Sequence, residues 1–88
     1  MKLCGEFVVR QVMEHTIVIP VGKTALRLNG MIMLNDVSQL IWNCLEQGTD
    51  VERTVAAVTD AFDVSADEAR ADILEFCNKL RKLQLLEE

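Results

Sequence analysis

The sequence predicts an α+β domain over residues 1–88, in which a three-stranded antiparallel sheet precedes three helices, as in a winged helix with its sheet placed first. Two observations predict this class. Apolar residues follow the two-residue period of strands up to about residue 35 and the period of helices after it. The second part also contains three helix-start signals, which divide it into three helices.

Three segments of the first part are expected to be strands because they are rich in β-branched and other apolar side chains. They are residues 7–13, 16–21 and 31–34. Residues 22–30 are expected to form a loop with a tight end, since Asn29-Gly30 is a typical hairpin turn. A short extra strand within residues 24–28 is left open.

Each expected helix begins with an acceptor side chain that is followed three residues later by Gln or Glu, the pattern of a capping box. The three boxes are Asp36 to Gln39, Thr49 to Glu52, and Ser65 to Glu68. An apolar stripe at helical spacing follows each box. The stripes are Val37, Leu40, Ile41, Cys44 and Leu45, then Val51, Val55, Val58 and Phe62, and finally Ala69, Ile73, Phe76, Leu80 and Leu83.

Composition and charge argue against several classes of function. The three cysteines and one histidine lie far apart, so we expect neither a metal site nor disulfides, and we expect Cys44 and Cys77 to be buried thiols. Residues 36–88 carry five basic and twelve acidic side chains, which argues against nucleic acid as a partner. No apolar run approaches the ~20 residues that cross a bilayer. With no signal-peptide pattern either, a cytoplasmic protein without membrane contact is expected.

No group of residues in the sequence is typical of an active site. His15, the only histidine, falls in a predicted turn with Glu14. The carboxylates are spread over helix faces and first turns, where they interact favourably with the helix dipole. We therefore expect a binding protein that is not an enzyme and has no cofactor.

The third predicted strand, Met31-Ile32-Met33-Leu34, is apolar on both faces. It carries neither the charge nor the proline that usually protects the edge of a sheet. Three interpretations remain open. Both faces are buried, one on the helices and the other under the 22–30 loop; or the edge forms a homodimer; or another chain adds a strand there.

A second candidate surface lies on the last helix. At about 100° per residue, Arg70, Leu74, Cys77 and Arg81 share one border of the apolar stripe. Leu74 is then either a peripheral core residue or part of an apolar pocket for a partner's anchor side chain. In the second case the two arginines would meet carboxylates of that partner.

Several short groups of residues also follow one another in a fixed order. They are Leu34-Asn35 leading to Ile41-Trp42, Leu45 and Gly48; the helix from Val51 to Phe62 with Val64-Ser65 and Glu68; and the ending Leu80-Arg81-x-Leu83 with Leu85-Leu86-Glu87. In this order and spacing they resemble the PqqD-like family (pyrroloquinoline quinone biosynthesis protein D), over about residues 6–87.

The resemblance implies a three-stranded sheet with three helices and no catalytic activity. It implies recognition of the leader of a ribosomally made precursor peptide as a strand added to the third strand and packed against the third helix. It further implies delivery to a modifying enzyme, often a radical S-adenosylmethionine enzyme. Carried onto this sequence, the contacts are Met31, Ile32, Met33 and Leu34 and the Leu74 side of the last helix, with Arg70, Cys77 and Arg81.

The 22–30 connection is longer than in the shortest members of that family and could cover part of the strand edge. Two alternatives to peptide recognition stay open. One is a structural dimerisation or scaffold domain that uses the same strand. The other is a winged-helix DNA-binding regulator, which the acidic second half of the chain disfavours.

Overall fold

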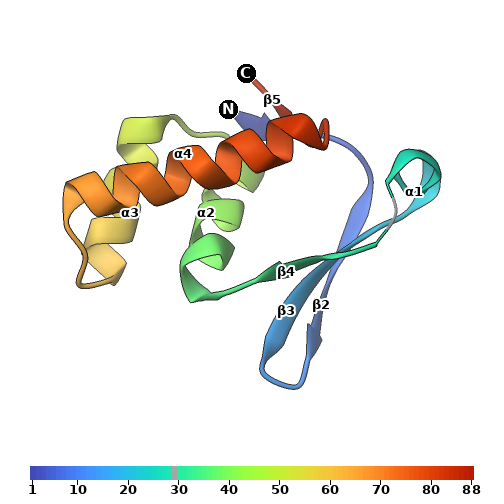
Figure 1. Cartoon of the computed structure of the whole chain (residues 1–88), viewed down its shortest axis with the longest axis horizontal. Coiled ribbons are helices and arrows are strands. Elements are labelled where there is room, and N and C mark those ends of the chain that lie inside the picture. Colours follow the sequence, from blue (N-terminus) through green and yellow to red (C-terminus); the bar gives the residue numbers. More distant parts are fainter. Residues whose placement is uncertain (29) are drawn as a thin grey trace.

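The structure is α+β, as the sequence predicts, with a three-stranded antiparallel sheet joined to a layer of helices (Figure 1). The computed structural model describes residues 1–28 and 30–88. The sheet has the order β2-β3-β4 and consists of β2 (Phe7–Val12), β3 (His15–Pro20) and β4 (Ile32–Leu34). The helices α2 (Asp36–Gln47), α3 (Val51–Ala61) and α4 (Ala66–Lys82) follow it. The predicted order of these six elements is therefore confirmed.

β2 and β3 form a hairpin whose turn lies one residue earlier than predicted. Val12 pairs with His15, so the turn consists of Met13 and Glu14, and His15 begins the second strand. Met13 has a φ of 58°, the left-handed conformation that a tight hairpin turn requires. The geometry of the two-residue turn, rather than the polarity of the side chains, thus determines its position.

Residues 22–27 form a short helix, α1 (Gly22–Arg27), where a loop or a short strand was expected. Contacts with distant parts of the chain hold this helix in place. The Thr24 hydroxyl accepts a hydrogen bond from the backbone N–H of Glu6 at 2.7 Å. Arg27 donates to two backbone carbonyls just beyond the end of α4, at 2.9 and 3.2 Å. The expected Asn29-Gly30 turn lies partly outside the described residues, because residue 29 is not among them.

The three main helices begin at side-chain caps, although two caps lie one residue away from the predicted acceptor. α2 is capped by Asn35 rather than Asp36, in a reciprocal capping box with two N···O distances of 2.8 Å. α3 is capped by Asp50 rather than Thr49, and α4 by Ser65, as predicted. Each cap gives a partner to a backbone N–H of the first turn and stabilises the fold by about 1 kcal/mol.

The core lies between the inner face of the sheet and the three helices, where the predicted apolar stripes meet. Its main members are Val18, Ile32, Leu34, Ile41, Trp42, Leu45, Val55, Val58, Ala69, Ile73, Cys77 and Leu80. The burial of Cys77 confirms that prediction, whereas Cys44 is only half-buried. Trp42 packs edge-on against the ring of Phe7 with the ring centroids 4.9 Å apart, which ties β2 to α2.

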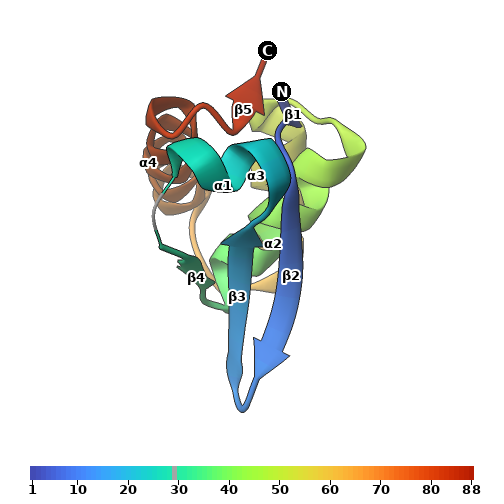
Figure 2. The same cartoon turned by 90° about the vertical axis from the view of Figure 1, so that its right-hand side faces the viewer.

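A second, two-stranded sheet brings the two ends of the chain together. β1 (Lys2–Leu3) pairs in antiparallel register with β5 (Leu86–Glu87), beside the labelled termini in Figure 2. The Met1 ammonium group also donates to the Thr49 carbonyl at 2.7 Å. This sheet was not predicted, because a strand of two residues has too few positions to show a period.

Candidate functional site

β4 forms one edge of the main sheet. It pairs with β3 on one side, in the register that places Met33 opposite Ile17. Within the described ranges, no strand pairs with its other side. Alternate backbone N–H and C=O groups of an edge strand point away from its neighbour, where they can bind a further strand. β4 therefore presents an open edge.

The side chains of this segment alternate between the core and solvent. Ile32 and Leu34 are 7% and 4% exposed, whereas Met31 and Met33 are 61% and 59% exposed. The interpretation in which the 22–30 loop buries the second face is therefore wrong. Two large, flexible apolar side chains remain in solvent beside an unpaired edge, which is an unusual combination for a protected strand.

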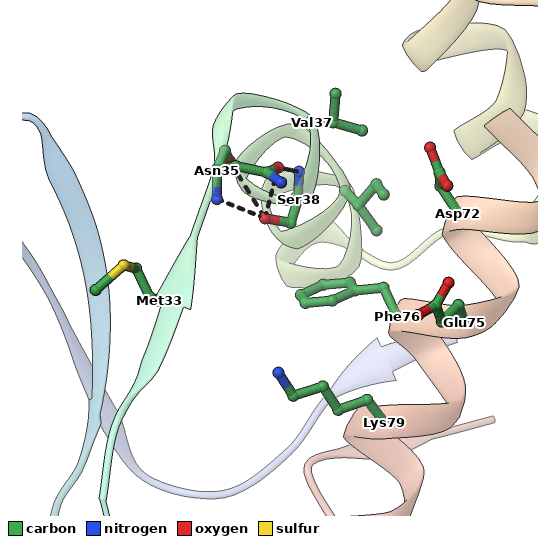
Figure 3. Close-up of a pocket in the computed structure, with 9 residues that line it drawn as sticks. Met33, Asn35, Val37, Ser38, Asp72, Glu75, Phe76 and Lys79 are labelled. Atoms are coloured by element: carbon green, nitrogen blue, oxygen red, sulfur yellow. Dashed lines mark hydrogen bonds between the residues drawn. The ribbon is translucent and has the colours of Figure 1, made fainter. Parts of the chain in front are cut away.

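A groove runs along this edge, between β4 and α4 (Figure 3). Its larger part is a hollow of about 370 Å³. It is lined by Met33, Asn35, Val37, Ser38 and Ile41 on one side and by Asp72, Glu75, Phe76 and Lys79 of α4 on the other. In Figure 3, Phe76 and Lys79 extend from α4 toward the strand side of the hollow.

The groove continues past Lys79 toward the other end of β4. A second hollow of about 280 Å³ is lined by Pro20, Leu28, Gly30, Met31, Ile32 and Met33 and, from the helix side, by Lys79 and Leu83. Both hollows border on Met33 and Lys79, so they are two parts of one groove. The end of β4 that leads into Asn35 lies by Asp72, and its beginning lies by Leu83, so β4 and α4 run in opposite directions.

The groove has an apolar floor and a charged rim. Ile41 is buried and Phe76 is half-buried. Among the described residues, the side chains of Asp72, Glu75 and Lys79 take part in no hydrogen bond or salt bridge of the chain. Glu75 and Lys79 are four positions apart, the spacing of helical ion pairs, and yet they do not form one. Their charges are left for solvent or for a ligand.

The helix border predicted from the sequence does not face this groove. Arg70 donates to both carboxylate oxygens of Glu52 in α3, at 2.7 and 3.2 Å. This hydrogen bonding holds the pKa of the Glu52 carboxyl below its usual range. The Arg70 guanidinium is thus paired within the chain, and its contact with a partner stays a prediction.

The rest of that border is occupied in a similar way. Arg81 donates to Glu88 at 2.6 Å, a hydrogen bond that lowers the pKa of Glu88. Cys77 is fully buried, and this burial raises the pKa of its thiol. Leu74 is 41% exposed but lines neither hollow. None of the four border residues lines the two hollows beside β4, and their contact with a partner stays a prediction.

The side chains that do face β4 lie on the opposite side of α4. They are Asp72, Glu75, Phe76, Lys79 and Leu83. From the sequence, Phe76 and Leu83 are expected only as members of the core stripe, and the three charged residues are not predicted to line a site. The available signal was their spacing, since 72, 75, 76 and 79 share one helix face that lies about 180° from Arg70 and Arg81.

Within residues 1–28 and 30–88, no group of three or more His, Cys, Asp or Glu side chains could hold a metal ion. His15 is exposed at the start of β3. None of the helices in the described part of the chain combines the length and apolar character that crossing a membrane requires.

The fold and the groove define a small α+β protein with an open strand edge. The chain belongs to the PqqD family. The family model described as "Coenzyme PQQ synthesis protein D (PqqD)" matches residues 14–86, which confirms the resemblance found in the sequence. No curated protein matches the chain significantly.

Among solved structures, the fold is similar to that of TbiB1, solved "in Complex with the TbiA(beta) Leader Peptide". The two share 24% sequence identity with a TM-score of 0.77, over 99% of this chain and 95% of the other. At this level of identity the likeness establishes a common fold.

Proposed function

We propose that this chain is a non-catalytic binding protein that captures the leader of a ribosomally made precursor peptide as a strand added to β4. In this proposal the bound peptide lies in the groove against α4, and the chain presents it to a modifying enzyme. A cytoplasmic location, where ribosomes make the precursor, belongs to the same proposal.

The open edge of β4 beside the groove is the observation that carries the proposal. An added strand would pair with the free N–H and C=O groups and cover the exposed Met31 and Met33. The stretch of α4 from Asp72 to Leu83 is about 16 Å long at the usual helical rise. That length corresponds to about five residues of extended strand. A standard peptide-recognition mode thus fits the size of the groove.

Two further observations support the choice of partner. Membership of the PqqD family supports a role in the biosynthesis of a modified peptide. TbiB1, which shares the fold, was solved with a leader peptide. A footprint of about five residues leaves the rest of a precursor outside the groove, within reach of an enzyme. The resemblance found in the sequence points to a radical S-adenosylmethionine enzyme for that role.

The proposal is tested by nuclear magnetic resonance on the isotope-labelled chain, titrated with the leader segment of the precursor encoded beside its gene. We expect the largest chemical-shift changes at residues 31–35 and at Phe76 and Lys79. A scrambled leader of the same composition is the control. If the chemical shifts of the β4 amides do not change when leader is added in excess, strand addition to β4 is wrong.

Sedimentation equilibrium distinguishes this function from dimerisation through the same edge. A monomer at micromolar concentration favours peptide capture. A dimer that dissociates as leader is added would show that both use the edge of β4, and a dimer that persists with leader bound would place the dimer interface elsewhere.

A further inference from the structure

We infer that the groove sets an order of charge in its ligand: a basic residue at position i, a large apolar residue at i+2 and an acidic residue at i+4, from the N-terminus to the C-terminus. This inference rests on the proposed addition of a strand to β4. It specifies which peptides that site would favour.

The two ends of the groove differ in charge. Asp72 and Glu75 lie at the end where β4 leads into Asn35. Lys79 lies in the middle. Lys82 lines neither hollow of the groove but follows one turn later, in a neighbouring hollow that it shares with Glu75, Lys79 and Leu83. The helical rise places Asp72 about 10 Å from Lys79 and about 15 Å from Lys82 along the axis. The helix wall is therefore acidic at one end and basic at the other.

The direction of the added strand follows from the sheet. β3 and β4 are antiparallel, and a further antiparallel strand continues the same pattern of nearly perpendicular hydrogen bonds. β4 runs from the Leu83 end of the groove toward the Asp72 end. An antiparallel ligand runs the other way, so its N-terminal part lies beside Asp72 and Glu75 and its C-terminal part beside Lys79.

The period of the ligand follows from strand geometry. Every second side chain of an added strand would point to the inner face of the sheet and thus toward α4. Positions i and i+4 are about 13 Å apart in a strand. That distance lies between the Asp72–Lys79 and Asp72–Lys82 separations along the axis of α4, which are about 10 and 15 Å. Position i+2 then lies over the apolar floor at Phe76 and Ile41.

The rim charges are available for such contacts. Within the described ranges, Asp72, Glu75, Lys79 and Lys82 form no salt bridge, whereas Arg70 on the other side of the same helix is paired with a carboxylate. The rim is solvent-exposed, so each ion pair with a ligand is weak and screened by salt. Two such pairs change the affinity by about three- to tenfold.

The test compares two end-capped synthetic peptides that have the same composition and opposite order. One contains Lys-Thr-Phe-Thr-Glu and the other Glu-Thr-Phe-Thr-Lys, with identical threonine flanks. Both are titrated against the labelled full chain at low and high salt. The Asp72→Lys/Lys79→Asp double variant, which keeps the net charge, is titrated in parallel, and Glu46→Lys, at an exposed site on α2, is the control for a charge change outside the groove.

We expect the basic-to-acidic peptide to bind about three- to tenfold more tightly at low salt, with the preference reduced at high salt. The double variant should abolish the preference, because Glu75 and Lys82 keep their charges and each end then carries one acid and one base, and Glu46→Lys should keep it. If both peptides bind with equal affinity and change the amide chemical shifts of β4, the charge order is wrong and strand addition to β4 stands. Tighter binding of the acidic-to-basic peptide would overturn the antiparallel direction.

A third result separates this inference from the proposed function. If the leader shifts β4 but neither synthetic peptide does, the charge pattern is wrong and leader capture stands. If neither the leader nor the peptides shift β4, both are wrong.

Discussion

The two sides of α4 carry similar kinds of side chain, charged groups next to apolar ones, but they differ in what those charges contact. On one side, Arg70 and Arg81 bind carboxylates of the chain itself, at 2.7 and 2.6 Å. On the other side, Asp72, Glu75 and Lys79 line the groove, and within the described residues they form no ion pair. The first side faces α3 and the chain terminus, and the second faces the open edge of β4.

This difference shows that the composition of a charged helix face is not enough to identify that face as a binding site. Arg70 and Arg81 were the more attractive candidates, because guanidinium groups bind carboxylates well. In the fold they do so within the chain. The charges that remain available are those beside an unpaired strand.

The largest effect is expected from Ile73, which lies fully buried between the two sides. Ile73→Ala should lower the free energy of unfolding by about 2–5 kcal/mol, because it leaves a cavity in the core. Urea denaturation measures this change. The control is Glu75→Ala on the exposed rim, for which we expect a change within about 0.5 kcal/mol. Similar losses in both variants would contradict the assigned burial of α4.

The next effect concerns binding. Met33→Asp should weaken leader binding by about tenfold or more, because an added strand would bury an unpaired carboxylate beside the groove. Val12→Asp is the matched control, since Val12 is 50% exposed on the opposite edge strand, against 59% for Met33. Fluorescence anisotropy with labelled leader measures both. Equal losses of affinity would show that the peptide does not distinguish the two edges.

A change of charge on each side of α4 tests the contrast directly. Lys79→Glu should weaken binding of the basic-to-acidic peptide about threefold. It should lower the free energy of unfolding by no more than about 1 kcal/mol, because Lys79 is on the rim but in the last turn of α4, where a cation is favourable. Arg81→Gln should leave peptide affinity unchanged and lower the free energy of unfolding by less than about 1 kcal/mol, through loss of a partly exposed ion pair. The opposite pattern would restore the border first predicted from the sequence.

The smallest effect is the dependence of stability on pH at the Arg70–Glu52 pair. Hydrogen bonding from Arg70 lowers the pKa of Glu52 in the folded state. The pair therefore stabilises the fold above the unfolded glutamate pKa of about 4.3, and this contribution is lost as pH falls through the lower folded pKa. In thermal unfolding between neutral and acid pH, Glu52→Gln should show a shallower loss of stability than the natural chain. Identical slopes would mean that the pair contributes nothing.

Much of the fold was predictable because it is local. The alternation of strands, the helical stripes and the capping side chains depend on neighbours within a few residues, and they gave the order of the six main elements correctly. The failures have physical causes as well. α1 is held by hydrogen bonds from Thr24 and Arg27 to distant backbone groups, and nothing in its own period marks it as a helix. The caps at Asn35 and Asp50 overlap with plausible acceptors next to them.

The candidate site, too, was partly predictable from local sequence and partly dependent on contacts between distant segments. Residues 31–34 could be predicted from the sequence as an apolar strand without the charge or proline that protects an edge. Which side of α4 lies opposite that strand could not be predicted in this way. A helical period fixes which residues share a face, but the rotation of the helix against the sheet depends on packing between distant segments. Packing turned Arg70 and Arg81 toward carboxylates of the chain and left Asp72, Glu75 and Lys79 along the open edge.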